Sequence, residues 1–196
     1  MAIPQRKSTN MGKDKRLRTV GDLLHWSYAN LAMAHAAVTH KAGAYNRVHF
    51  MIRARLFSGL SSKTMTIGSL AEDERMKMTY PQACCYCGAK DKLSIDHLIP
   101  TALGGTGSAD NLIWACRSCN SSKGAIDVME WHSRRNIFPP LLLVRRYLKV
   151  AIAEAQHRGA MDALLHEPPR LPFSLDHIPT SFPPPDQLSL WITERL

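Results

Sequence analysis

The spacing of apolar residues along the chain predicts three amphipathic helices. Apolar side chains recur at intervals of three and four in residues 22–40, in residues 45–57 and again after Pro139 and Pro140. This interval places them on one face of a helix. Proline is tolerated at a helix start, so the pair of prolines favours a long helix that begins beside them.

The charged residues of the second and third helices are expected on their outer faces. In residues 45–57 the inward set is predicted to be Val48, Met51, Ile52 and Leu56, and the outward set Arg47, Arg53 and Arg55. In the third helix the inward set is Leu141, Val144, Leu148, Ala151, Ile152 and Ala155, with Arg145, Arg146 and Lys149 elsewhere on its surface. Outward arginines can contact a nucleic acid, although a solvated face is the commoner explanation.

The pattern changes between Tyr80 and Gly124. Two short β-prone stretches, residues 93–95 and 112–115, flank a glycine-bearing loop, and a short polar stretch that ends at Gly124 is typical of a helix. These features predict a β-hairpin followed by a helix, set between helical regions, which makes the fold class α+β. The predicted regions are a basic arm at 1–17, an N-terminal helical region at 18–79, a core at 80–130, a C-terminal helical region at 131–166 and a proline-rich tail at 167–196.

Composition and charge narrow the class of protein. Apolar residues make up 45% of the chain, which favours a globular fold, and no apolar run reaches the ~20 residues of a membrane span. The basic start lacks the apolar core of a secretory signal, so we expect a cytoplasmic protein. The formal net charge of +9 favours a polyanionic partner such as nucleic acid, although a basic soluble protein without such a partner remains the alternative.

The cysteines predict a structural zinc site. Cys84 and Cys87 form one C-x-x-C pair, and Cys116 and Cys119 form a second. Four thiolates in two such pairs can surround one tetrahedral zinc ion and leave no ligand position open, so the zinc is expected to be structural. Cys85 also precedes Cys87, but at C-x-C spacing, so we choose Cys84 as the ligand and expect no role for Cys85. A thioredoxin-like site would need a βαβ context that the sequence lacks.

The polar residues between and beside the cysteine pairs carry a family resemblance. Asp96 and His97 leave the first predicted strand, Asn111 precedes the second, and Asn120 directly follows the last cysteine in the run CRSCNSSKG. This order resembles the HNH endonucleases of the ββα-metal, or His-Me finger, group, in their four-cysteine zinc-bearing branch. The resemblance spans roughly residues 80–130 and implies a small ββα-metal finger braced by the zinc site.

The resemblance also implies a role for each polar residue. His97 is the expected general base, because a neutral imidazole can take a proton from water at physiological pH. Asp96 and Asn120 offer hard oxygen atoms that suit Mg²⁺ or Mn²⁺. Asn111 is expected to tie down the loop and help orient the histidine. Where many family members carry a last histidine this chain has Asn120, which affects the preferred metal.

Other polar residues near the motif have weaker assignments. Lys123 and Arg117 can contact phosphate. Surface residues beside a zinc knuckle also occur without any phosphate contact, so both interpretations stay open. His132 is expected to be a packing or helix-surface residue.

The sequence therefore predicts a metal-dependent phosphodiesterase that nicks or cuts DNA, with RNA not excluded. A single site cuts a single strand, so a double-strand break would need a homodimer, a second encounter or a partner protein. Small HNH nucleases occur as restriction enzymes, mobile-element enzymes and effectors of anti-phage defence, and an effector held by a partner fits the flanking helices. The alternative is a zinc-stabilised nucleic-acid-binding or adaptor module without catalysis.

Overall fold

The computed structural model describes residues 17–68 and 82–192. Within these ranges the chain forms five α-helices and one antiparallel two-stranded sheet, so the α+β prediction is confirmed. Residues 1–16 of the predicted basic arm lie outside the described ranges. The helices and strands are α1 (Val20–Thr39), α2 (Arg47–Ser61), β1 (Leu93–His97), β2 (Leu112–Cys116), α4 (Arg117–Lys123), α5 (Val128–Arg134) and α6 (Leu141–His157).

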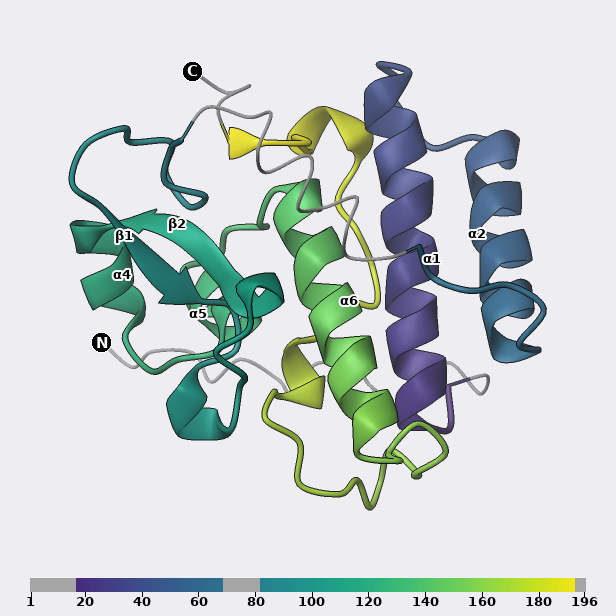
Figure 1. Ribbon diagram of the computed structural model, residues 1–196. Helices are drawn as coiled ribbons and strands as arrows, with labels where there is room; N and C mark the ends of the chain where they lie inside the picture. Colours follow the sequence, from purple (N-terminus) through teal and green to yellow (C-terminus); the bar gives the residue numbers. More distant parts are fainter. Residues whose placement is uncertain (1–16, 69–81, 193–196) are drawn as a thin grey trace, which may run out of the picture.

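Three of the helices form a layer in which α1 stands between α2 and α6 (Figure 1). Thr19 begins α1 with a reciprocal capping box, since its hydroxyl accepts from the Asp22 amide and the Asp22 carboxylate accepts from the Thr19 amide. The centre of the layer is apolar and excludes solvent, with Leu23 and Leu24 of α1 and Leu148 of α6 each 0% exposed. Burial of these faces supplies the main stabilising term of this region.

The second helix is rotated from the predicted orientation. Val48 and Met51 are 63% and 59% exposed, so their predicted inward position is wrong. Arg53 turns inward instead, where its guanidinium donates to the Asn30 side chain and lies 4.7 Å from the centre of the Trp26 ring. Helix α2 packs chiefly on α1, so only a narrow face of α2 needs to be buried. An arginine can occupy part of that face when an amide and an aromatic ring contact its guanidinium.

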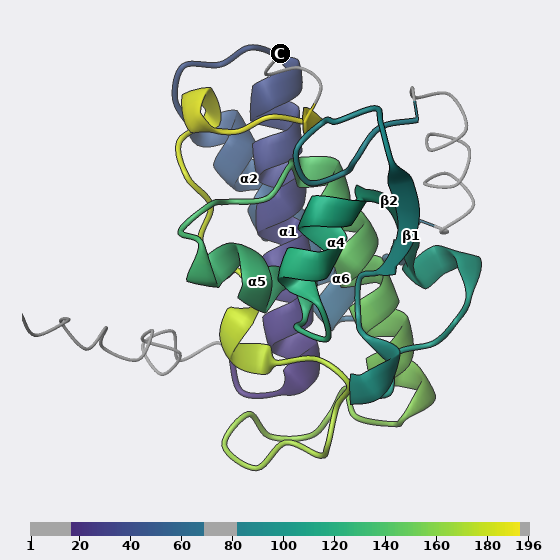
Figure 2. The same ribbon diagram turned by 90° about the vertical axis from the view of Figure 1, so that its left-hand side faces the viewer.

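The predicted hairpin and short helix are confirmed. β1 and β2 pair antiparallel with Asp96 opposite Ile113, and α4 follows β2 without a break and ends at Gly124. Asp127 begins α5 by accepting from the Met129 and Glu130 amides. Figure 2 shows the hairpin, α4 and α5 in front of α6, on the side away from α2.

Helix α6 carries the predicted apolar face, since Leu141, Val144, Leu148, Ala151, Ile152 and Ala155 are all buried. The prediction that Arg146 and Lys149 lie on its surface is wrong, because only 6% and 3% of these residues is exposed. The Arg146 guanidinium donates to the Asp110 and Ala109 carbonyls, and these bonds offset the cost of its burial.

The proline-rich tail packs across the helical layer. Thr180 accepts a hydrogen bond from the Trp26 indole, and Pro183 accepts one from the Tyr45 hydroxyl. Further on, the Ser189 and Leu190 carbonyls accept from the Leu141 and Leu142 amides at the start of α6. The tail therefore satisfies amides that Pro140, which has no capping side chain, leaves open.

Candidate functional site

The four predicted zinc ligands come together at the base of the hairpin. The Sγ atoms of Cys84, Cys87, Cys116 and Cys119 all lie within 4.8 Å of one another. The Cys87 and Cys116 sulfur atoms are 3.7 Å apart. Zinc–sulfur bonds of ~2.3 Å give a tetrahedron with edges of about 3.8 Å, so the spacing fits a four-cysteine zinc site.

Local structure explains how each pair is held. The Gly88 amide donates to the Cys84 carbonyl in a turn where Gly88 takes a positive φ of 78°, a conformation that glycine adopts without strain. In the second pair, Cys116 ends β2 and Cys119 lies in the first turn of α4. The Cys85 sulfur is not part of the cluster, which supports the choice of Cys84 over Cys85.

The thiols differ in how readily they ionise. The Cys119 amide, which donates to the Cys116 sulfur, lowers the pKa of Cys116 to about 7. Burial raises the pKa of Cys84. Since only thiolates bind zinc, a cation must offset the burial of the Cys84 charge, which ties the fold of this region to metal.

The Asp96 carboxylate is buried at the end of β1 and accepts three hydrogen bonds. Oδ1 accepts from the Lys123 ammonium at 3.1 Å and from the His97 amide at 2.8 Å, and Oδ2 accepts from the Tyr86 hydroxyl at 2.7 Å. Burial, and then the Asp96 charge, raise the pKa of Tyr86 well above its ordinary value, so its hydroxyl stays protonated and donates. The carboxylate is therefore fixed in position.

Lys123 is the partner that the sequence did not predict for Asp96. Its side chain is 0% exposed, so the alternative in which it contacts phosphate from the surface is wrong for this structure. Burial of an ammonium is costly unless it is paired, and the ion pair with Asp96 supplies that partner. Arg117, at the first position of α4, is exposed, and its contact with phosphate stays a prediction.

Asn111 holds the segment that follows His97. Its amide nitrogen donates to the Ile99 and Thr106 carbonyls at 2.8 and 2.7 Å, and its Oδ1 accepts from the Ile99 amide at 2.9 Å. Gly105 lies close by, where an added Cβ would sit 2.0 Å from the Ile99 carbonyl oxygen, so only glycine fits. The loop between β1 and β2 is thus closed around one buried asparagine.

Helix α4 places Asn120 beside β1. The amide nitrogen of Asn120 donates to the Ser94 hydroxyl at 3.0 Å and to the Ile95 carbonyl at 3.2 Å. Asn120 and Lys123, one turn apart, therefore face the same edge of β1 that carries Asp96. His97, the next residue of the strand, is partly exposed. Asn120 therefore lies beside the strand that ends with Asp96 and His97.

His132 packs behind this cluster, as expected. It is 2% exposed and lies between aromatic rings, with its centre 5.8 Å from that of Tyr86 and 5.0 Å from that of Trp131. Burial, with a smaller contribution from the Arg135 charge, lowers the pKa of His132 to about 4. A neutral ring that supports Tyr86 is a packing residue.

A comparison with protein families identifies this region. Residues 84–125 match the family model described as HNH endonuclease. This segment is an HNH endonuclease domain. The HNH domain contains the four cysteines, Asp96, His97, Asn111 and Asn120, and it indicates nuclease activity on nucleic acid. No curated protein and no solved structure matches the chain.

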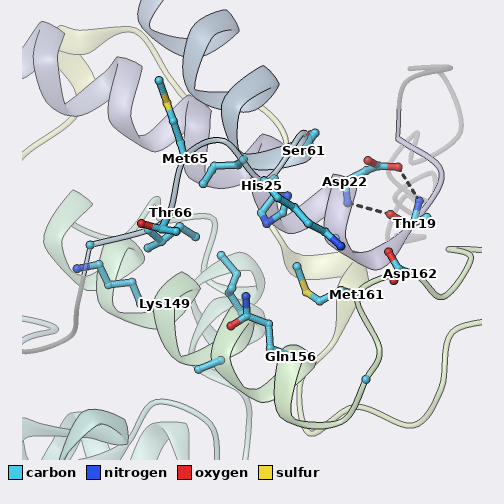
Figure 3. A pocket seen from close by; sticks show the side chains of 18 residues that line it. Thr19, Asp22, His25, Ser61, Met65, Thr66, Lys149, Gln156, Met161 and Asp162 are labelled. Carbon is cyan, nitrogen blue, oxygen red and sulfur yellow. Dashed lines mark hydrogen bonds between the residues drawn. The ribbon is translucent and has the colours of Figure 1, made fainter.

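The rest of the described chain lies outside the HNH domain. A cavity of about 710 Å³ opens between the start of α1, the end of α2 and α6, and Figure 3 shows His25, Lys149 and Gln156 among its lining residues. No residue of the HNH domain lines this cavity, so it is separate from the cluster at β1. None of the helices in the described ranges is long and apolar enough to cross a membrane.

Proposed function

We propose that this protein is a metal-dependent HNH endonuclease that hydrolyses phosphodiester bonds in DNA. The observation that carries the proposal is the match of residues 84–125 to the HNH family, in a fold where Asn120 bonds β1, the strand that ends with Asp96 and His97. A lone Asp-His pair would more often be structural, but this pair lies in a family of nucleases and beside a second oxygen ligand.

His97 is the proposed general base. It follows Asp96 at the end of β1, and the residue is partly exposed, so water and a substrate phosphate can approach it. A neutral imidazole removes a proton from water and thereby makes the nucleophile for attack on phosphorus. The backbone around His97 is fixed, because its amide donates to Asp96 and the Leu98 amide donates to the Asn111 carbonyl.

Asp96 and Asn120 would hold a catalytic Mg²⁺ or Mn²⁺. A carboxylate has about four acceptor positions, and Asp96 uses three of them, which leaves one on Oδ2. Asn120 donates through its nitrogen, and in the described residues its Oδ1 accepts no hydrogen bond. This donor set fits a hard divalent cation with water in the remaining positions, and such a cation would neutralise charge on the scissile phosphate.

Lys123 and Asn111 support these groups without touching the substrate. Lys123 keeps the Asp96 carboxylate aimed by holding Oδ1, and Asn111 closes the loop behind His97. Groups that are held before the substrate arrives cost little reorganisation during the reaction.

The biological setting we propose is a restriction or anti-phage defence effector in the cytoplasm. One site per chain cuts one strand, so double-strand cleavage needs a homodimer or a partner protein. The net charge of +9 supports non-specific attraction to DNA, and the same attraction applies to RNA.

The test is cleavage of nucleic acids by purified wild type, His97→Ala and His166→Ala, after zinc content is found equal. Each protein is incubated with supercoiled plasmid, single-stranded DNA and RNA, in Mg²⁺, Mn²⁺ or EDTA. We expect metal-dependent nicking of plasmid that falls by roughly 10²-fold or more in His97→Ala, because the base is lost. His166, exposed just before the proline-rich tail, is the matched control and should cut like wild type. Equal cutting by His97→Ala would contradict the proposed base.

A second candidate is a non-catalytic binding or adaptor module, and the buried Asp96–Lys123 pair favours it. An ammonium already neutralises the carboxylate that should bind the metal. Wild type that binds DNA but cuts no substrate under any metal, with binding unchanged in His97→Ala, would support this module.

A further inference from the structure

The segment directly behind His97 is held from two sides. On one side, the Leu98 amide donates to the Asn111 carbonyl at 2.9 Å, and the Asn111 side chain bonds both the amide and the carbonyl of Ile99. On the other side, the Val128 amide donates to the Leu98 carbonyl at 3.2 Å. Leu98 and Ile99 are 0% and 1% exposed, so these contacts and their packing fix the strand exit, the point where the chain leaves β1.

Arg146 of helix α6 holds the turn that precedes Asn111. The Arg146 guanidinium donates from Nε to the Asp110 carbonyl at 2.8 Å and from an Nη atom to the Ala109 carbonyl at 2.6 Å. These carbonyls belong to the two residues just before Asn111. A planar guanidinium that donates to two successive carbonyls sets both the position and the orientation of this turn.

Tyr147, the next residue of α6, holds the segment that contains Val128. The Tyr147 hydroxyl donates to Asp127 Oδ2 at 2.8 Å, and Tyr147 is 0% exposed. Asp127 Oδ1 accepts from the Met129 and Glu130 amides, so the carboxylate joins α6 to the start of α5. Val128, which bonds Leu98, follows Asp127 directly.

We propose that Arg146 and Tyr147 of α6 are positioning residues for His97. Two consecutive side chains of one buried helix fix the two segments that hold Leu98 and Ile99, and those residues set where the strand ends and how the imidazole is presented. Both lie outside the HNH domain of residues 84–125, so the flanking helix completes the active site. The inference rests on the proposed function, since positioning matters only if His97 acts in catalysis.

Helix α6 can position other residues because its own place in the fold is fixed. Its apolar face is buried against α1, and its first two amides are bonded by the tail. A displacement of about 1 Å at a reacting group can lower a rate by roughly 10²-fold, so small shifts of the strand exit have large kinetic effects.

The test uses Arg146→Met, Arg146→Lys and Tyr147→Phe with matched controls on α2 and just before it. Arg53→Met removes a partly buried arginine bonded to Asn30, and Tyr45→Phe removes a hydroxyl bonded to Pro183. Helix α2 and the hairpin lie on opposite sides of α1 (Figure 1). Two measurements are made on each zinc-loaded variant: hydrogen exchange of the peptide amides in residues 98–111, and kcat and KM for plasmid nicking.

We expect faster exchange in residues 98–111 for Arg146→Met and Tyr147→Phe, with exchange in α1 unchanged. The kcat should fall about 10- to 100-fold in Arg146→Met and about 3- to 10-fold in Tyr147→Phe, with KM within about twofold. Arg146→Lys should recover part of the loss, and the controls should match wild type. If Arg146→Met does not fold, Arg146→Lys and Tyr147→Phe decide the question.

Two results would overturn the proposal. Unchanged exchange in residues 98–111 would mean that α6 does not hold the segment, and faster exchange with unchanged kcat would mean that the segment does not position the base. If wild type cuts no nucleic acid, the proposed function fails, and the exchange measurement still decides whether α6 holds the segment.

Discussion

The HNH domain and the helical layer beside it are held together by different forces. The HNH domain has two five-residue strands and a seven-residue helix, each too short to be stable alone. It buries apolar side chains such as Leu98 and Ile113, but polar groups lie among them: the cysteine cluster, the Asp96–Lys123 pair and the Asn111 bonds. In the layer, α1 and α6 have 20 and 17 residues and meet through fully buried leucine and valine side chains.

The HNH domain carries the candidate catalytic residues, whereas the helical layer carries most of the stability. A polar cluster can place a base and metal ligands, but it needs a cation and a rigid support to persist. Helix α6 provides the support, and Arg146 and Tyr147 are where the two regions join. Changes in the HNH domain should therefore act through charge and metal, whereas changes in the layer should act through packing.

Removal of zinc should have the largest effect. In Cys84→Ser one ligand is lost, and we expect loss of stoichiometric zinc and unfolding of the HNH domain, because zinc binding contributes roughly 10 kcal/mol in small zinc domains. Cys85→Ser is a matched control in the adjacent residue and should keep its zinc. Metal content and hydrogen exchange measure both. Zinc loss in Cys85→Ser with retention in Cys84→Ser would reverse the ligand assignment.

Breaking the buried ion pair should have the next largest effect. Lys123→Met leaves the Asp96 charge buried without its cation, and we expect a loss of about 3–5 kcal/mol in the free energy of unfolding. The double variant Lys123→Met/Asp96→Asn should recover most of that loss, because no unpaired charge is left. Urea unfolding of the zinc-loaded proteins measures each term. Costs that simply add would show that the two groups are not coupled.

The smallest of these effects is a pH dependence at the joint between the regions. Burial raises the pKa of Asp127 from 3.8 to about 6 in the folded protein. The folded state therefore binds the proton more tightly, so this contribution to stability is full below about pH 4 and is lost as pH rises to about 6. The loss amounts to at most about 3 kcal/mol.

Asp127→Asn isolates this contribution, because the amide can still cap α5. Urea unfolding of both proteins between pH 4 and pH 7 should show the stability of wild type, relative to the variant, falling across that window. A difference that is constant with pH would mean that Asp127 has an ordinary pKa.

Motif and periodicity predicted much of the molecule. The hairpin, α4, the apolar face of α6 and the ligand set with Cys84 follow from local spacing, because thiolate ligands and strand alternation are short-range patterns. The choice of Asp96, His97 and Asn120 as site residues followed from the family pattern. Their roles in catalysis stay predictions, as do the region boundaries 18–79 and 131–166.

The errors have one physical origin. Arg53, Arg146 and Lys123 were expected at the surface because a charged side chain is costly to bury alone. Each is buried or partly buried beside an acceptor or aromatic ring contributed by a distant segment: Asn30 and Trp26, the carbonyls before Asn111, and Asp96. Periodicity along one helix carries no information about such partners. Only the packing of elements that lie far apart in the sequence reveals them.

The most direct measurement is the rate of plasmid nicking by zinc-loaded wild type and His97→Ala in Mg²⁺, with enzyme in excess over DNA. We expect nicked plasmid from wild type, with nicking abolished by EDTA and slowed by roughly 10²-fold or more in His97→Ala. Nicking at the same rate in both proteins would contradict the claim that the exit of β1 is the active site.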